Sequence, residues 1–223
     1  MTGTWAVIPV KPLEQAKSRL LTDLQAAECA LLSQAMFRDV LHALEAARGI
    51  DGITVLTHDD TVARLTLQMG HVVIPDENAE LNLGLDAAAH RIAGLGADRM
   101  LVIPADIPTI TSKDIEQLLR EHTSGLGLCP AIRDGGTNAL LVSPPDAIEF
   151  HFGADSARRH LDAAQQRGIN SSHLLIPAFS HDIDTADDLV RLSQQQVDCH
   201  TVHYLRSSGI FARLGLKPAR ISA

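Results

Sequence analysis

The apolar positions of the chain alternate between short continuous runs and longer, periodic stretches. Four short runs have the composition of buried strands: 5–10, 53–58, 71–76 and 99–106. Each is followed by a stretch with apolar side chains at the spacing of a helix that packs on a core: 22–48, 59–69, 83–94 and 112–122. Four strand-then-helix units in succession predict an α/β fold with a mostly parallel central sheet and helices on both faces.

The pattern changes in the second half of the chain. Two apolar runs, "LGLCPAI" and "NALLVSP", flank a glycine turn and predict a local antiparallel pair. A helix over 156–167, a strand over 173–178 and a helix over 186–196 are expected next. The last residues mix Gly, Ser, Pro and Arg, so we predict one domain over 1–196 and a surface-packed C-terminal tail over 197–223.

Composition narrows the function classes. The chain has 223 residues, of which 45% are hydrophobic and 3% aromatic, so an aliphatic core of one large domain is expected. A formal net charge of −8 argues against sequence-independent nucleic-acid binding, but it leaves room for a local basic pocket. The sequence shows no signal-peptide pattern, no apolar run near the ~20 residues of a membrane span, and three dispersed cysteines. We therefore expect a cytoplasmic protein without a membrane partner.

Ligands of such sheets bind beyond the carboxyl ends of the strands, so the residues that follow the strands carry the candidate chemistry. The first strand is followed by "KPLEQAKSRL", which places Lys11, Lys17 and Arg19 in one short loop. These cations suit the oxygens of a triphosphate. The alternative is an ordinary solvated loop that leads into a helix.

Three aspartates are candidates for a metal site. Asp106 follows the fourth strand between two prolines, in "PADIP". Asp182 and Asp184 are separated by one residue, so in an extended chain they project to the same side. Two carboxylates that share a site repel each other unless a cation lies between them, which predicts Mg²⁺ at this trio. Asp187 and Asp188 are assigned to a helix cap, and a cap or turn is also the alternative for Asp106.

The stretch "DGGTN" is followed by Leu-rich strand residues, and a hairpin turn is its simplest interpretation. A second interpretation is a cradle for an anion. Gly153 to Ser156 would place backbone N–H groups at a helix N-terminus, where phosphates bind readily, and Thr137 and Asn138 would close that site from the strand side. Three side chains of the same helix could add positive charge: Arg158, Arg159 and His160. The alternative is that some of them simply face water, and we expect only one of the two arginines to take part.

Several common motifs are missing from the sequence. It has no G-x-x-x-x-G-K-[ST] loop, no complete G-x-G-x-x-G and no G-x-S-x-G. Walker-type nucleotidases, dinucleotide-dependent dehydrogenases and serine hydrolases of that type are therefore disfavoured. The eleven histidines form no H-x-x-x-H pair on a helix, which disfavours zinc.

The motifs "VIPVKPLEQAKSRL", "PADIP", "DGGTNALL", "FGADS" and "DIDTADDL" occur in an order that resembles the CofC/FbiD guanylyltransferases of coenzyme F420 biosynthesis. The resemblance covers residues 6–192. It implies a nucleotide-diphospho-sugar transferase-like fold, with 1–196 as the nucleotidyltransferase domain. It also implies an enzyme that condenses GTP with 2-phospho-L-lactate, phosphoenolpyruvate or 3-phospho-D-glycerate and releases pyrophosphate.

The resemblance also implies roles for individual residues. Metal binding falls to Asp106, Asp182 and Asp184, and acceptor contacts fall to Thr137, Gly153 and Ser156, with Asn138 beside them. The GTP phosphates would meet Lys11, Lys17 and Arg19, and Asn82 in "ELNLGLDAAA" would approach the nucleoside. Among these residues, Asp106, Asp184 and Lys17 are the predicted catalytic groups.

The implied chemistry is attack of an acceptor phosphate oxygen on the α-phosphorus of GTP. That oxygen is already an anion, so no general base is required; the difficulty is repulsion between two polyanions, which cations relieve. His151, near Gly153, could donate a hydrogen bond to a glycerate hydroxyl and so favours 3-phospho-D-glycerate. The alternative is that His151 merely alternates outward along the strand.

Other functions remain open from the sequence. The acceptor could be molybdopterin or a sugar phosphate, and the D-x-D of "DIDT" is also compatible with a glycosyltransferase. A non-catalytic nucleotide-binding protein is a further alternative. The expected partners are small molecules, GTP and the acid, and the 197–223 tail could mediate a homodimer.

Overall fold

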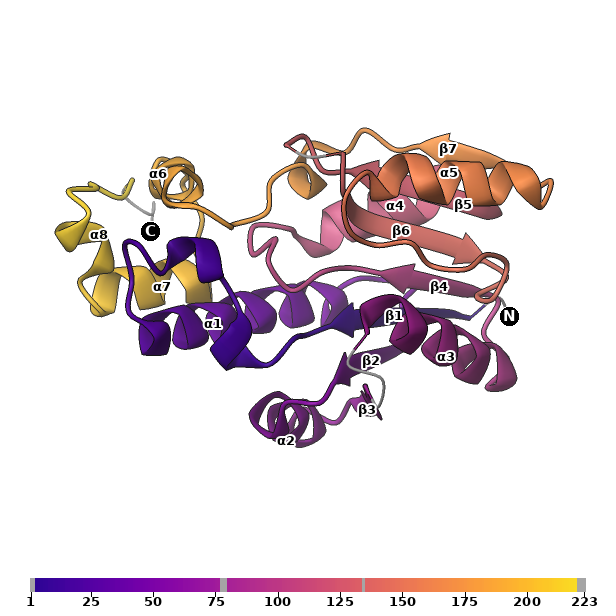
Figure 1. The fold of residues 1–223 in the computed structure, drawn as a ribbon, viewed down its shortest axis with the longest axis horizontal. Coiled ribbons are helices and arrows are strands. Elements are labelled where there is room, and N and C mark those ends of the chain that lie inside the picture. The colour runs from indigo at the N-terminus through magenta and orange to yellow at the C-terminus, as the bar shows by residue number, and fades with distance from the viewer. Residues whose placement is uncertain (1–2, 77–79, 134, 220–223) are drawn as a thin grey trace.

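The computed structural model describes residues 3–76, 80–133 and 135–219. Within them, seven strands form one sheet in the order β3-β2-β1-β4-β6-β5-β7 (Figure 1). The strands are β1 Thr4–Pro9, β2 Gly52–Thr57, β3 Val72–Pro75, β4 Arg99–Val102, β5 Gly125–Pro130, β6 Thr137–Ser143 and β7 Ser171–His173.

The strand directions confirm the predicted mixture of parallel and antiparallel pairing. β1 runs parallel to β2 and β4, and β2 runs parallel to β3. β6 is antiparallel to both of its neighbours, β4 and β5, while β5 and β7 are parallel. Since β1, β2, β3 and β4 point the same way, their carboxyl ends form one edge of the sheet. The loop with Lys17, after β1, and the loop with Asp106, after β4, both begin at this edge.

Helices cover both faces of the sheet, as expected (Figure 1). They are α1 Ala26–Glu45, α2 Asp60–Gln68, α3 Leu81–Gly94, α4 Ser112–Glu121, α5 Ser156–Gln166, α6 Ala186–Ser193, α7 His200–Ser207 and α8 Ile210–Arg213. Side chains alternate across a strand, so Ile8 of β1 packs in a core with α1, α2 and α4, whereas Val7 packs in a second core with α3 and α5.

Several predicted boundaries are wrong. The helix expected from residue 22 begins at Ala26, where the Gln25 N–H donates to the Glu28 carboxylate at 2.9 Å. The strand expected over 99–106 ends at Val102, two residues before a proline that lacks an N–H donor. The strand expected over 173–178 lies earlier, at β7. The chain leaves the sheet after His173: Leu175 is 81% exposed, and Pro177 starts a short 3₁₀ turn.

The described part of the 197–223 segment contains two helices that pack on the domain, where a surface tail was expected. Val202, Leu205, Ile210 and Phe211 of α7 and α8 are buried in a third core with side chains of α1 and α6. The Asp39 carboxylate of α1 accepts hydrogen bonds from the first N–H groups of α7, at 2.8 and 2.9 Å. Figure 1 shows α6, α7 and α8 gathered beside the N-terminal half of α1. These helices therefore contribute apolar packing, which the polar composition of the segment concealed.

Among the described residues, no helix is both long enough and apolar enough to cross a membrane.

Candidate active site

Three aspartates from two distant segments meet beyond the carboxyl ends of the strands. Asp106 lies in the loop after β4, and Asp182 and Asp184 lie in the extended segment before α6. The two segments are joined by a backbone hydrogen bond of 2.9 Å from the N–H of Ile183 to the carbonyl of Asp106. Each aspartate offers one carboxylate oxygen, and these oxygens all lie within 4.8 Å of one another. We call these three residues the carboxylate cluster.

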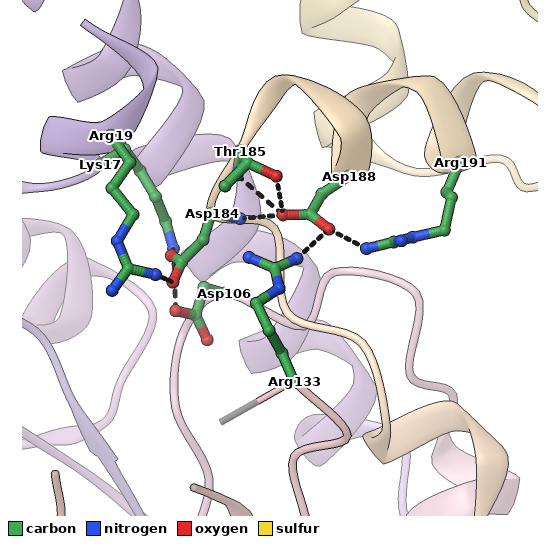
Figure 2. A network of polar contacts seen from close by, with 8 residues as sticks. All are labelled: Lys17, Arg19, Asp106, Arg133, Asp184, Thr185, Asp188 and Arg191. Carbon is green, nitrogen blue, oxygen red and sulfur yellow. Dashed lines mark hydrogen bonds and ion pairs between the residues drawn. The ribbon is translucent and has the colours of Figure 1, made fainter. Parts of the chain in front are cut away.

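Lys17 reaches this cluster from the loop after β1. Its ammonium lies 2.8 Å from Oδ2 of Asp106 and 2.6 Å from Oδ1 of Asp184, and its side chain is only 8% exposed (Figure 2). Its backbone is left-handed, with φ 58°, a conformation that costs a non-glycine residue energy and usually has a functional or structural reason. Arg19, which is largely exposed, approaches Asp184 at 3.5 Å.

The proximity of these charges shifts their pKa values. Burial raises the pKa of Asp182, and the charges of Asp106 and Asp184 raise it further. Burial opposes ionisation of Asp184 too, but the Lys17 ammonium outweighs it and lowers the pKa of Asp184. For Lys17, burial favours the neutral amine, yet the two carboxylates raise its pKa overall. The three carboxylates of the cluster thus carry more negative charge than the single ammonium of Lys17 offsets.

A cavity of about 670 Å³ opens beside the cluster. Asp106 and Asp184 lie on its wall together with the three predicted phosphate-binding cations, Lys11, Lys17 and Arg19. Apolar side chains complete other parts of the wall: Leu13, Leu56, Leu81 and Phe152. The cavity therefore combines apolar surface with cations beside a carboxylate cluster, a combination suited to a nucleotide with its phosphates.

Asp76 also lines this cavity and was not among the predicted site residues. It follows β3 directly and ends the predicted strand 71–76, and a charged side chain at that position was a usable signal. Its Oδ2 lies 4.0 Å from Nδ1 of His58, and its Oδ1 is buried without a hydrogen-bond partner. An unpaired buried acceptor is costly, so this oxygen is poised to accept from a ligand donor.

Asp188 links the carboxylate cluster to the turn between β5 and β6. Its Oδ2 accepts from the N–H groups of Asp184 and Thr185, at 2.9 and 2.7 Å, which confirms its predicted capping role for α6. Its Oδ1 pairs with both Arg133 and Arg191 (Figure 2). Burial would raise the pKa of Asp188, but the hydrogen bonds from Arg133 and the backbone lower it to about 2. The contact with Arg133 was not predicted, because only the fold brings that turn to α6.

The predicted acceptor site is assembled, but its hydroxyls are buried. Oγ1 of Thr137 lies 2.9 Å from Oγ of Ser156 and 3.3 Å from Nδ1 of His160. Nε2 of His160 accepts from the His151 N–H at 2.9 Å, so Nδ1 carries the proton and donates to Thr137. Burial lowers the pKa of His160 to about 3, and the prediction that this side chain supplies positive charge is wrong.

The turn and the α5 N-terminus lie together, since the carbonyl of Gly135 accepts from the Ala157 N–H at 3.0 Å. Gly153 has φ +125°, a conformation that favours glycine, and the buried Nδ2 of Asn138 has no hydrogen-bond partner among the described residues. The side-chain amide of Asn82 donates to the Phe152 carbonyl at 3.1 Å and accepts from the Phe152 N–H at 2.7 Å. It thereby holds a cavity-lining residue in place, and its contact with a nucleoside stays a prediction.

An open sheet with carboxylates and cations at the carboxyl ends of its strands, beside a nucleotide-sized cavity, defines a nucleotidyltransferase. The comparisons with known proteins agree and identify the family. Residues 4–221 match the family model described as "Guanylyl transferase CofC like", so the chain belongs to the CofC family of guanylyltransferases. The match includes most of the 197–223 segment, beyond the residues 6–192 that carry the sequence resemblance.

The relatives differ in the acid that they are named for. The chain is 37% identical over 191 residues to phosphoenolpyruvate guanylyltransferase of Sphaerobacter thermophilus, covering 85% of this chain and 92% of that one. It is 33% identical to 2-phospho-L-lactate guanylyltransferase of Methanothermobacter thermautotrophicus, with coverages of 97% and 94%. It is also 33% identical to 3-phospho-D-glycerate guanylyltransferase of Colwellia psychrerythraea, with coverages of 84% and 90%.

Solved structures show the same fold at low sequence identity. A protein of Desulfovibrio desulfuricans G20, described as a nucleotide-diphospho-sugar transferase, superposes with a TM-score of 0.80 at 18% identity, covering 96% of this chain and 98% of that one. A nucleotidyl transferase of Methanothermobacter superposes with a TM-score of 0.58 at 18% identity, with coverages of 93% and 100%. The predicted fold class is therefore confirmed.

Proposed function

We propose that this guanylyltransferase joins GTP to a phosphorylated three-carbon acid and releases pyrophosphate, as a step of coenzyme F420 biosynthesis. The observation that carries the proposal is the carboxylate cluster with Lys17 bound to it on the wall of the cavity. This arrangement answers the main physical problem of the reaction, which is to bring two polyanions together.

The cluster fits Mg²⁺. Its donors are hard carboxylate oxygens, within 4.8 Å of one another, and the buried Oδ1 of Asp106 has no hydrogen-bond partner in the part of the chain that the structure describes. Asp106, Asp182 and Asp184 would hold the ion. When bound, Mg²⁺ would neutralise phosphate charge and polarise the phosphoryl oxygens.

The cations of the loop after β1 give the nucleotide its orientation in this proposal. Lys17, Lys11 and Arg19 bind the triphosphate, and Lys17 and Arg19 do so beside Asp184. The attacking phosphate oxygen of the acid is already ionised, so the chain supplies position and charge rather than a base. Pyrophosphate leaves on the side of the loop cations, whose positive charge stabilises it.

Thr137, Asn138, Gly153 and Ser156 form the proposed acceptor site. Its support is the pairing of the two hydroxyls and the unpaired Nδ2 of the buried Asn138, which can donate to an oxyanion. The positive N-terminal end of α5 adds a favourable potential for a phosphate, while the Ser156 and Ala157 N–H groups themselves donate to the carbonyls of Gly153 and Gly135.

Two observations point to different acids. The relatives that are 35–39% identical are named for phosphoenolpyruvate, which makes that acid the first to test. His151, which favours 3-phospho-D-glycerate, has Nδ1 at 3.4 Å from Arg159, so the pair forms a polar group next to the acceptor site. The glycerate hydroxyl would meet this pair.

A pyrophosphate-release assay with GTP and each of the three acids tests the proposal. We expect release with one acid well above the others, and little release with ATP or CTP. Release with molybdopterin or a sugar phosphate, and with none of the acids, would assign a different acceptor. Nucleotide binding without any release would assign a non-catalytic role.

A further inference from the structure

Arg133 lies beside the carboxylate cluster, to which Asp188 connects it. It belongs to the turn between β5 and β6, and Thr137 of the proposed acceptor site is the first residue of β6. Its Nη2 donates to Oδ1 of Asp188, whose side chain is 1% exposed, while the arginine side chain is 34% exposed. The guanidinium is therefore anchored at one end and accessible at its other atoms.

The anchor fixes the arginine relative to the metal ligands. The second carboxylate oxygen of Asp188 accepts the Asp184 N–H at 2.9 Å, so one side chain bridges Arg133 and a member of the cluster. The pKa of Arg133 is raised, chiefly by its hydrogen bond with Asp188 and further by the charges of Asp182 and Asp184. The guanidinium thus lies within electrostatic reach of the cluster.

The cluster receives positive charge from two directions. Lys17 and Arg19 come from the loop after β1, on the wall of the cavity. Arg133 comes from the turn between β5 and β6 and does not line that cavity. Figure 2 shows the second terminal nitrogen of Arg133 on the side of Asp184 and Asp106, whereas Arg191 meets Asp188 from the opposite side. A guanidinium has five N–H donors, and the bond to Asp188 uses one nitrogen.

We propose that Arg133 binds an oxyanion of the acceptor acid, with Asp188 holding its guanidinium in the required orientation. This inference rests on the proposed function. Arg133 would receive the acid on the turn side of the cluster while Lys17 and Arg19 hold the nucleotide on the cavity side. The fork of N–H donors matches the geometry of a carboxylate or a phosphate group, and the acceptor acid carries both.

Arg191 offers a matched control, because it pairs with the same oxygen of Asp188 but points away from the cluster. Arg133→Met, Arg133→Lys and Arg191→Met are compared with the unaltered protein. The acid is titrated by calorimetry in the presence of Mg²⁺ and a non-hydrolysable GTP analogue, and the KM values of acid and GTP are measured by pyrophosphate release. Thermal unfolding reports whether each variant folds.

Arg133→Met is expected to weaken acid binding roughly ten- to hundredfold, the effect of a lost hydrogen bond to a charged group. The KM for GTP is expected to stay unchanged. Arg133→Lys is expected to recover part of the lost acid affinity. Arg191→Met is expected to leave the acid affinity and the KM for GTP unchanged. Equal acid affinity in Arg133→Met and Arg191→Met, or a parallel loss of GTP affinity in Arg133→Met, would overturn the inference.

The source of the oxyanion is resolved with glycerol 3-phosphate as a competitive ligand, since it keeps the phosphate and lacks the carboxylate. If Arg133 binds the carboxylate, Arg133→Met weakens the binding of 3-phospho-D-glycerate but not that of glycerol 3-phosphate. If Arg133 binds the phosphate, the binding of both compounds weakens to the same extent. The two proposals also fail separately: acid binding that depends on Arg133 without pyrophosphate release contradicts the proposed function alone, whereas release with unchanged acid affinity in Arg133→Met contradicts this inference alone.

Discussion

The ammonium of Lys17 lies 2.6 Å from a carboxylate oxygen of Asp184, a residue 167 positions further along the chain. The same ammonium lies 2.8 Å from Asp106, so one cation joins the loops after β1 and β4 to the segment before α6. In this arrangement Lys17 neutralises part of the charge that a divalent ion would otherwise neutralise. A triphosphate that draws Lys17 away would leave the carboxylates free for the metal, and this couples nucleotide binding to metal binding.

Lys17→Met tests this coupling through two effects of opposite sign. Without the competing ammonium, Mn²⁺ alone should bind more tightly, by roughly tenfold, as expected for one removed like charge near the site. Binding of GTP with Mg²⁺ should weaken by a similar or larger factor, because a charge-assisted contact is lost. Calorimetry with Mn²⁺ and with the Mg²⁺–GTP complex measures both.

Lys11→Met is the control, because Lys11 lines the same cavity but, among the described residues, it is Lys17 and Arg19 that pair with the cluster. This variant should weaken GTP binding without changing the affinity for Mn²⁺. Mn²⁺ affinity that stays the same or falls in Lys17→Met would show that the ammonium does not compete with the metal.

Asp76 is the residue that we expect to select guanine. Its side chain lies on the cavity wall, and its buried Oδ1 has no hydrogen-bond partner among the described residues. A carboxylate can accept from both the N1–H and the 2-amino group of guanine, whereas adenine offers no such pair. Asp76→Asn should therefore reduce the preference for GTP over ATP by roughly tenfold or more, measured as a ratio of kcat/KM.

Inosine triphosphate, which lacks the 2-amino group, provides an internal comparison. The unaltered protein should have a higher kcat/KM for GTP than for inosine triphosphate, and this ratio should be smaller in Asp76→Asn. An unchanged GTP preference in the variant would assign guanine selection to other groups.

His160 makes stability depend on pH. Its side chain is 0% exposed, and burial lowers its pKa to about 3 from 6.5. The unfolded chain therefore takes up a proton below pH 6.5 that the folded chain excludes, so the free energy of unfolding falls as the pH drops from 6.5 towards 3. The loss from this group is about 2 kcal/mol over the first two pH units.

Urea unfolding of the unaltered protein and of His160→Gln at several pH values isolates this contribution. The variant is expected to be less stable at neutral pH, because two hydrogen bonds of the ring are altered, but its stability should fall less steeply on acidification. Parallel curves for the two proteins would show that His160 takes up a proton without unfolding.

The sequence alone predicts the sheet and most of the chemistry at its edge. The strands and helices up to residue 122 have strong periodicity. The acids stand out because Asp106 ends the apolar run "RMLVIPAD" and because Asp182 and Asp184 alternate across Ile183 in "HDIDT". Parallel strands bring the residues that follow β1 and β4 to one edge by geometry. Asp184 reaches that edge through the hydrogen bond of its segment, from the Ile183 N–H to the Asp106 carbonyl.

The rest depends on contacts that no local pattern encodes. Arg133 gains its place from a pairing with Asp188, and the register of the β5–β6 hairpin decides where that arginine points. Leu175 is apolar but 81% exposed, because the run that contains it lies outside the sheet. In α7 the apolar pair Val202 and Leu205 has helical spacing, but the surrounding Ser and Gly residues outweigh so short a signal.

The turnover of Asp106→Asn tests the central claim most directly, with Asp187→Asn as the control for the same change of charge on the exposed cap of α6. Pyrophosphate release from GTP and the preferred acid is measured for both variants, after thermal unfolding has shown that they fold. The account predicts a fall of roughly a thousandfold or more for Asp106→Asn, in line with the loss of an electrostatic catalytic group, and near-normal release for Asp187→Asn. Near-normal release by a folded Asp106→Asn would contradict the account, because the carboxylate cluster would then have no part in the chemistry.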